Sequence, residues 1–393
     1  MMTSLVSQIL PPRGHLLPRL DRPLVMTAGL LMAIGIVVVG SASTEVAQAN
    51  YGSPFYHLIR HLVYLGVALG LAGLTFLVPI NLWEKLGWVL LVLSLVLLAL
   101  VLVPGIGREV NGSMRWLKIG PISMQASEVA KLFMLIYLAG YLVRRLQEVR
   151  SQWSGFIKPM LVMLLAIVLL LLEPDFGAVV VLMTASLGMM FLGGVRLVQF
   201  VVLISVSGVA MALVAIAQPY RMQRLITFMD PWAEENVFAS GYQLTQALIA
   251  FGRGEWFGVG LGNSVQKLFY LPEAHTDFVF AIWAEEMGLL GSVLVIGLFL
   301  MLVYRCLSIG HRAEHTGRFF AAYLCYGIGF LLAAQTMINI GVNTGLLPTK
   351  GLTLPLLSYG GSSLIVCAVS IAMVLRVDYE SQQVPVTQEK YRA

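Results

Sequence analysis

The 393-residue sequence contains few charged side chains: only 11% of its residues are Asp, Glu, Lys or Arg, whereas 58% are hydrophobic. Soluble globular domains carry about 25% charged residues, because charged groups cover the surface that faces water. The mean hydropathy of +0.85 points the same way. This shortage of charge excludes a water-soluble chain of this length and predicts an integral membrane protein. The net charge of +5 does not indicate nucleic-acid binding, because the basic residues are scattered among the ends of apolar segments.

Cysteine is scarce as well. Cys306, Cys325 and Cys367 lie in or beside apolar segments, and none belongs to a Cys-x-x-Cys pair. This pattern excludes a disulfide framework and a cysteine metal site. We expect the three thiols to act as small apolar packing groups, and we predict no metal site.

Long apolar runs are abundant. Runs of about 17–25 apolar residues mark helices long enough to cross a bilayer. The expected helices are Leu24–Ser43, Leu58–Val78, Leu86–Val103, Ser127–Leu146, Pro159–Leu172, Phe176–Gly194, Leu197–Ala217, Phe278–Arg305, Phe319–Gly341 and Ser358–Val377. The sequence therefore predicts an all-α integral membrane protein of about ten transmembrane helices. We expect one membrane domain, residues 23–378, between a basic N-terminal tail, 1–22, and a C-terminal tail, 379–393.

The distribution of Lys and Arg indicates the orientation. If the N-terminus is cytoplasmic, the cytoplasmic segments hold 15 of the 25 Lys and Arg residues. Basic residues concentrate in cytoplasmic loops of membrane proteins. We therefore expect both termini in the cytoplasm.

The segments between the expected helices differ in length. The outer segment between the seventh and eighth helices, residues 218–277, has about 60 residues, and long loops in compact proteins are usually functional or disordered. This one contains many aromatic residues, so we expect it to fold partly as amphipathic helices on the outer membrane surface. Two other outer segments, 104–126 and 342–357, carry basic residues. Any chemistry should therefore take place on the outer face.

Two groups of charges lie at or inside the expected helices, where an unpaired charge costs several kcal/mol. Glu128 and Lys131 share a helix face through their i, i+3 spacing, and they form either a structural ion pair or part of a polar cavity for substrate. The run from Leu271 to Phe278 includes Glu273, His275 and Asp277. Acidic residues stabilise any helix start, but the number of ionisable groups here exceeds what capping requires and favours a functional role.

Several motifs resemble those of the SEDS family (shape, elongation, division, sporulation). They are Asn-Gly-Ser-Met-Arg-Trp-Leu (111–117), Pro-Tyr-Arg-Met-Gln-Arg (219–224), Leu-Pro-Glu-Ala-His-Thr-Asp-Phe (271–278), Ala-Glu-Glu-Met-Gly-Leu-Leu-Gly (284–291) and the run from Pro348 to Ser363. The similarity covers about residues 20–378. The basic N-terminal tail and Gly-Ser-Ala-Ser (40–43) favour the cell-division branch over the elongation branch.

The resemblance implies a peptidoglycan glycosyltransferase that polymerises lipid II on the outer face of the cytoplasmic membrane. It also implies a class B penicillin-binding protein, a transpeptidase, as partner, together with other membrane proteins of the division machinery. The family's essential acidic residue falls on Asp277, its conserved lysine on Lys350, and its intramembrane pair on Glu128 and Lys131.

We therefore expect Asp277 to act as general base, with Glu273 and His275 supporting it. Cations suit the diphosphate of a lipid-linked sugar. The candidates on the outer side are Arg115, Lys118, Arg221, Arg224, Arg253 and Lys350. We assign no cofactor with certainty and keep a divalent cation as an alternative.

Two other functions fit parts of the sequence. A flippase that moves lipid II across the bilayer would also have ten helices and intramembrane charges. Transporters, however, place polar residues near the midplane and often contain repeats, and we find no repeat. The third hypothesis is a non-catalytic division scaffold that recruits a transpeptidase. It predicts that cells with Asp277→Asn grow normally.

Overall fold

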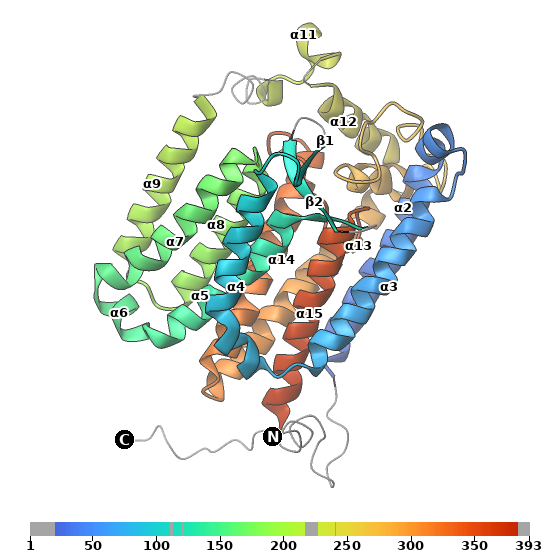
Figure 1. The fold of residues 1–393 in the computed structure, drawn as a ribbon. Helices are drawn as coiled ribbons and strands as arrows, with labels where there is room; N and C mark the ends of the chain where they lie inside the picture. The colour runs from blue at the N-terminus through green and yellow to red at the C-terminus, as the bar shows by residue number, and fades with distance from the viewer. Residues whose placement is uncertain (1–19, 111–112, 120–121, 217–226, 240, 384–393) are drawn as a thin grey trace.

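The computed structural model describes residues 20–110, 113–119, 122–216, 227–239 and 241–383, and in these ranges the chain is an α-helical bundle with one small sheet (Figure 1). The helices are α2 (Arg22–Tyr51), α3 (Tyr56–Leu77), α4 (Ile80–Val101), α5 (Ala126–Arg144), α6 (Leu146–Ser151), α7 (Trp153–Leu172), α8 (Phe176–Leu192), α9 (Leu197–Ile216), α11 (Glu234–Val237), α12 (Tyr242–Gly254), α13 (Val279–His315), α14 (Phe319–Asn343) and α15 (Gly361–Gln382). The strands are β1 (Gly107–Val110), β2 (Ser113–Ile119) and β3 (Ile122–Gln125).

The helices match the apolar runs. Within the described residues, eight helices are long and apolar enough to cross a membrane: α2, α3, α4, α5, α7, α13, α14 and α15. The apolar helices α8 and α9 coincide with the sixth and seventh expected segments. The prediction of a helical multi-pass membrane protein is confirmed, whereas the number of ten crossings stays a prediction. Helix α15 continues through residues 379–382, which the sequence analysis assigned to the C-terminal tail.

The bundle has a buried centre and an apolar outside. Helices α5, α14 and α15 are mostly buried, whereas α3 and α4 expose many large apolar side chains. An apolar outer surface is unfavourable in water, but it suits a bilayer, because lipid tails are as apolar as leucine. The sheet, α11 and α12 lie at one end of the bundle, opposite the start of α2 and the end of α15 (Figure 1).

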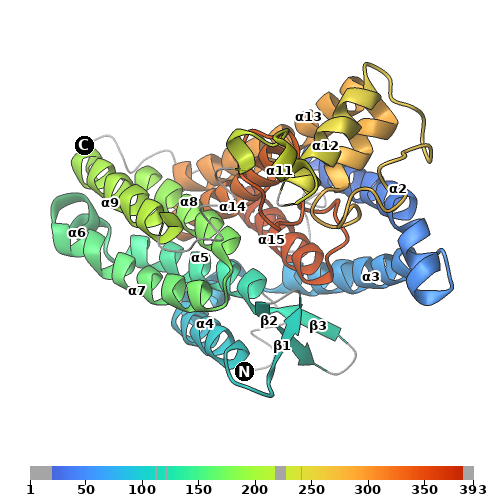
Figure 2. The ribbon, with the colours of Figure 1, turned by 90° about the horizontal axis from the view of Figure 1, so that it is seen from above.

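The three-stranded sheet is an addition to the expected all-helical architecture. Strands β1, β2 and β3 form an antiparallel sheet in that order, and it packs on α4, α5 and α15. Seen along the bundle, it lies next to the ends of these helices (Figure 2). The sequence analysis interpreted this segment only as a basic outer loop.

Helix α13 is interrupted at Gly288, whose φ of 66° is costly for residues with a side chain. The loop after α12 replaces helical hydrogen bonds there: the amide N–H of Val259 donates to the carbonyl of Glu285, and that of Leu289 donates to the carbonyl of Glu255. A Cβ at Gly288 would lie 2.4 Å from the nitrogen of Gly258. The part of the long outer loop that follows α12 is therefore joined to α13 by backbone hydrogen bonds, and the single membrane domain stays a prediction.

Candidate functional site

A cavity of about 620 Å³ opens at the end of the bundle that carries the sheet. Its walls come from α3, the sheet, the start of α5, the start of α12, the segment before α13, the segment between α14 and α15, and the first turn of α15. The predicted site residues among those that line it are Arg115, Glu128, Glu273, Asp277 and Lys350. The structure thus brings together side chains that are far apart in sequence.

Asp277 lies in the wall just before α13 and is partly exposed. Two asparagines of α14 hold its backbone: Asn339 Nδ2 and Asn343 Nδ2 donate to its carbonyl oxygen over 2.9 and 3.0 Å. Gly351 faces its carboxylate, because a Cβ at that glycine would lie 2.9 Å from Asp277 Oδ2. The backbone of Asp277 is therefore held by α14, and its carboxylate lies beside the loop that carries Lys350.

The surroundings of Asp277 raise the pKa of its carboxyl to about 7. Burial is the largest cause, and the negative charge of Glu273 adds to it. The positive charge of Arg115 acts in the opposite direction. A carboxyl group with a pKa near the working pH is well suited to take up a proton during catalysis.

Glu273 and His275 surround Asp277 differently. Glu273 lines the cavity, is exposed and accepts a hydrogen bond of 2.7 Å from Thr276 Oγ1. His275 lies behind the wall, where its ring is 4.7 Å from the ring of His57 and its carbonyl accepts from the amide of Tyr359. Burial lowers the pKa of His275 to about 4, so its ring is neutral at pH 7.

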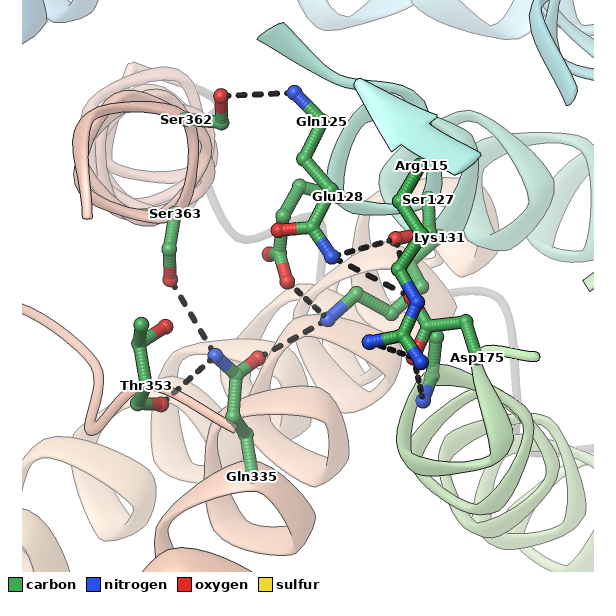
Figure 3. Close-up of polar contacts among 11 residues, drawn as sticks. Arg115, Gln125, Ser127, Glu128, Lys131, Asp175, Gln335, Thr353, Ser362 and Ser363 are labelled. Carbon is green, nitrogen blue, oxygen red and sulfur yellow. Dashed lines mark hydrogen bonds and ion pairs between the residues drawn. The ribbon is translucent and has the colours of Figure 1, made fainter. Parts of the chain in front are cut away.

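Glu128 and Lys131 form a buried ion pair (Figure 3). Lys131 Nζ lies 2.9 Å from Glu128 Oε1, and the two side chains are 1% and 5% exposed respectively. Lys131 also donates to Gln335 Oε1, and Gln335 Nε2 donates to the carbonyl of Thr353. Of the pair, only Glu128 is part of the cavity lining, and Lys131 lies behind it.

Arg115 and Lys350 supply positive charge to the cavity. Arg115 extends from β2 toward the turn between α7 and α8, where it donates to the carbonyl of Glu173 and lies 4.0 Å from Asp175 Oδ1. Asp175 accepts from Ser127 Oγ over 2.8 Å, which ties the turn to α5 (Figure 3). The Lys350 ammonium lies 4.4 Å from the centre of the Phe176 ring.

The other predicted cations lie elsewhere. Arg253 is at the end of α12 and forms an ion pair of 3.3 Å with Glu285, which is fully buried. It is not among the residues that line the cavity. Arg221 and Arg224 lie outside the described residues.

The sequence analysis missed several residues of the cavity and its support. The asparagines of α14 and Gln335 gave no signal, because their role depends on segments that only the fold brings together. Arg60 did carry a signal, since an arginine within an expected transmembrane helix is costly and often functional. It lines the cavity from α3.

The chain is similar to known proteins along almost its whole length. Residues 21–383 match the FtsW/RodA/SpoVE family, described as cell cycle proteins. A probable peptidoglycan glycosyltransferase FtsW from Pseudomonas fluorescens is 56% identical over 363 residues, which is 92% of this chain and 89% of the relative. A protein of the same name from Halomonas elongata is 58% identical over 355 residues, 90% and 89% of the two chains.

Two solved structures are also similar. One comes from a peptidoglycan synthase complex that coordinates polymerisation and crosslinking. Its TM-score is 0.75 and its sequence identity is 32%, and the match covers 93% of this chain and 99% of that chain. The other is the rod shape determining protein RodA from Thermus thermophilus, with a TM-score of 0.67, 31% identity and coverage of 91% and 96%.

Proposed function

Because this chain belongs to the FtsW/RodA/SpoVE family of cell cycle proteins, we propose that it polymerises lipid II into glycan strands at the cavity around Asp277. The chain is a peptidoglycan glycosyltransferase of the cell-division group and a multi-pass protein of the bacterial inner membrane. Its reaction occurs on the outer face of the membrane and contributes to septal cell-wall synthesis.

The observation that carries the proposal is a partly buried carboxylate in a cavity whose lining includes the cationic side chains of Arg115 and Lys350. Asp277 is the base, and Arg115 and Lys350 are the cations. The hydroxyl oxygen of the acceptor sugar forms a bond to the anomeric carbon of the donor sugar. The bond between that carbon and the lipid diphosphate breaks, and its electron pair leaves with the diphosphate. The hydroxyl proton moves to Asp277, and the cations stabilise the charge on the departing group.

The partner and the orientation belong to the same proposal. A class B penicillin-binding protein would cross-link the strands as they leave the cavity, since one structural relative comes from a complex that coordinates polymerisation and crosslinking. The excess of Lys and Arg in the segments on the side of the chain ends supports cytoplasmic termini. The residues that line the cavity come from the sheet and from segments at the other end of the bundle, which agrees with a reaction outside the cytoplasm.

Vesicles containing the purified protein and its transpeptidase partner test this function against the flippase alternative. With lipid II supplied in the leaflet next to the cavity, we expect glycan strands that a muramidase digests. The same vesicles report movement of labelled lipid II between leaflets. Movement of lipid II without any glycan would overturn the proposal in favour of a transporter.

The pH dependence of polymerisation provides a second test. Because Asp277 acts as a base, it must lose its proton first, and its pKa is about 7. The rate should therefore rise with pH and level off above about pH 7, falling about tenfold for each unit further into acid. Replacing Arg115 by Gln removes an attractive charge, so the rise should move to higher pH. Glu273→Gln removes a repulsive charge and should move it to lower pH.

Lys118→Gln is the matched control for these shifts. Lys118 lies on the same strand as Arg115 but is exposed and does not line the cavity. Its loss should leave the pH of the rise unchanged. A profile that is flat across this range, or that moves equally in all three variants, would contradict the role of Asp277.

A further inference from the structure

Arg60 is a cation that neither the sequence motifs nor the proposed reaction assigns. It lies in the second turn of α3, an apolar helix long enough to cross the membrane, and lines the cavity. A charge in such a helix is costly unless it has a partner or a function. Its position facing the cavity rather than lipid indicates a polar partner inside the cavity.

Two tyrosines of the same helix fix the guanidinium of Arg60. Arg60 Nη1 donates to the hydroxyl of Tyr56 and Nη2 to that of Tyr64, each over 3.1 Å. The guanidinium carbon lies 5.7 and 5.8 Å from the centres of these two rings. Tyr64 is held against the start of α15, because a Cβ at Gly361 would lie 2.6 Å from its ring. Arg60 is therefore oriented before any ligand binds.

No carboxylate among the described residues forms an ion pair with this oriented charge. Across the described parts of the chain, no acidic side chain lies within 4.0 Å of the Arg60 guanidinium, whereas Arg305, Arg312, Arg318 and Arg376 all have such partners. The guanidinium has five N–H donors, and the tyrosines use two of them. The rest can bind an anion, and phosphate suits the planar arrangement of these donors.

The chemistry of the proposed reaction requires two diphosphate sites. Donor and acceptor are both lipid-linked sugars, and each carries its own diphosphate. The donor diphosphate is attached to the carbon that reacts, so it lies near Asp277, where Lys350 adjoins Gly351 and the charge of Arg115 acts. The acceptor reacts through its distal sugar, so its diphosphate lies a disaccharide away from the base. Arg60 lines the cavity from α3, whereas Arg115 lines it from the sheet and Lys350 from the segment between α14 and α15.

We propose that Arg60, oriented by Tyr56 and Tyr64, binds the diphosphate of the acceptor substrate, while Arg115 and Lys350 bind the diphosphate of the donor. This assignment rests on the proposed polymerase function. It divides the cavity into a donor side at the sheet and an acceptor side at α3. It also makes Arg60 a residue that determines which of two chemically identical substrates occupies which side.

Two blocked lipid II analogues separate the sides in a coupling reaction of one cycle. An analogue without the 4-hydroxyl of its N-acetylglucosamine acts only as donor, and one with a carbon linkage between sugar and diphosphate acts only as acceptor. Arg60→Gln should raise the KM of the acceptor analogue about tenfold or more, as for loss of a charge-assisted hydrogen bond. The donor KM should stay within about twofold of wild type, and Arg60→Lys should recover part of the effect. The double variant Tyr56→Phe, Tyr64→Phe keeps the charge of Arg60 but removes the hydrogen bonds that orient its guanidinium. It should raise the acceptor KM less than Arg60→Gln does.

Other outcomes would overturn the proposal, assign Arg60 to a different ligand or count against the polymerase function. Equal changes in both KM values, a change in the donor KM alone, or no change would overturn the proposal. A change seen only in vesicles rich in phosphatidylglycerol, and absent in phospholipid-free detergent, would assign Arg60 to a bilayer phospholipid. Failure of the wild-type protein to couple the two analogues would count against the polymerase function instead. If Arg60→Gln does not fold, the tyrosine variant gives the answer through the same two KM values.

Discussion

Reversing one charge of the Glu128–Lys131 pair should abolish activity and destabilise the protein by about 3–5 kcal/mol. The reason is that both side chains are almost fully buried and lie 2.9 Å apart, so Glu128→Lys or Lys131→Glu places two like charges in contact. Thermal unfolding in detergent and glycan synthesis from lipid II measure the two effects. Each single reversal should lower the unfolding temperature and remove glycan synthesis.

The double reversal distinguishes a structural role from a role in the cavity. Opposite charges again face each other in it, so much of the stability should return. Activity should not return, because Glu128 lines the cavity and Lys131 donates to Gln335, whose amide oxygen cannot accept from a glutamate. Recovery of activity together with stability would mean that the pair serves packing alone.

The pair Arg145–Glu148, whose arginine is exposed, supplies the matched control. It has the same i, i+3 spacing and a distance of 3.4 Å, but the Arg145 side chain is 61% exposed. Surface ion pairs contribute about 0–1 kcal/mol. Arg145→Glu should leave stability and glycan synthesis close to wild type, because Glu148 keeps its second ion pair, with Lys158.

The membrane helices were predictable because their signal is local. A bilayer requires a continuous run of apolar residues, and α4 or α13 shows such a run without reference to the rest of the chain. The sheet was not predictable in the same way. Its strands have only four, seven and four residues, and they are stable because they pair with each other and pack on α4, α5 and α15.

The candidate site was predictable where a charge conflicts with its environment. Glu128, Lys131 and Asp277 lie at or inside apolar helices, which is why the sequence singles them out. Arg253 shows the limit of this argument. Its charge and its outer position predicted a role in binding the substrate diphosphate. In the fold, however, Arg253 forms an ion pair of 3.3 Å with Glu285, a buried carboxylate of α13. Sequence position does not reveal which of several acidic groups a cation will meet.

Asp277→Asn should reduce glycan synthesis about 10²–10⁴-fold, the usual contribution of a general base. The acceptor hydroxyl is a poor nucleophile, and asparagine cannot take its proton. The fold should persist, because the contacts of Asp277 with Asn339 and Asn343 use its backbone carbonyl, which asparagine retains. Membrane insertion and binding of the transpeptidase partner should therefore be unaffected.

Glu273→Gln is the control for this substitution. Glu273 also lines the cavity, but it is exposed and affects Asp277 only through its charge. Its replacement should change the rate much less than that of Asp277. A larger loss with Glu273→Gln than with Asp277→Asn would exchange the roles of the two carboxylates.

The most direct test is the rate of glycan formation by purified Asp277→Asn protein with its partner, at saturating lipid II, while lipid II binding is measured in the same preparation. We predict binding within about twofold of wild type and a rate at least about a hundredfold lower. Glycan synthesis at a rate near that of wild type would contradict the account, and Glu273, the other carboxylate that lines the cavity, would become the next candidate for the base.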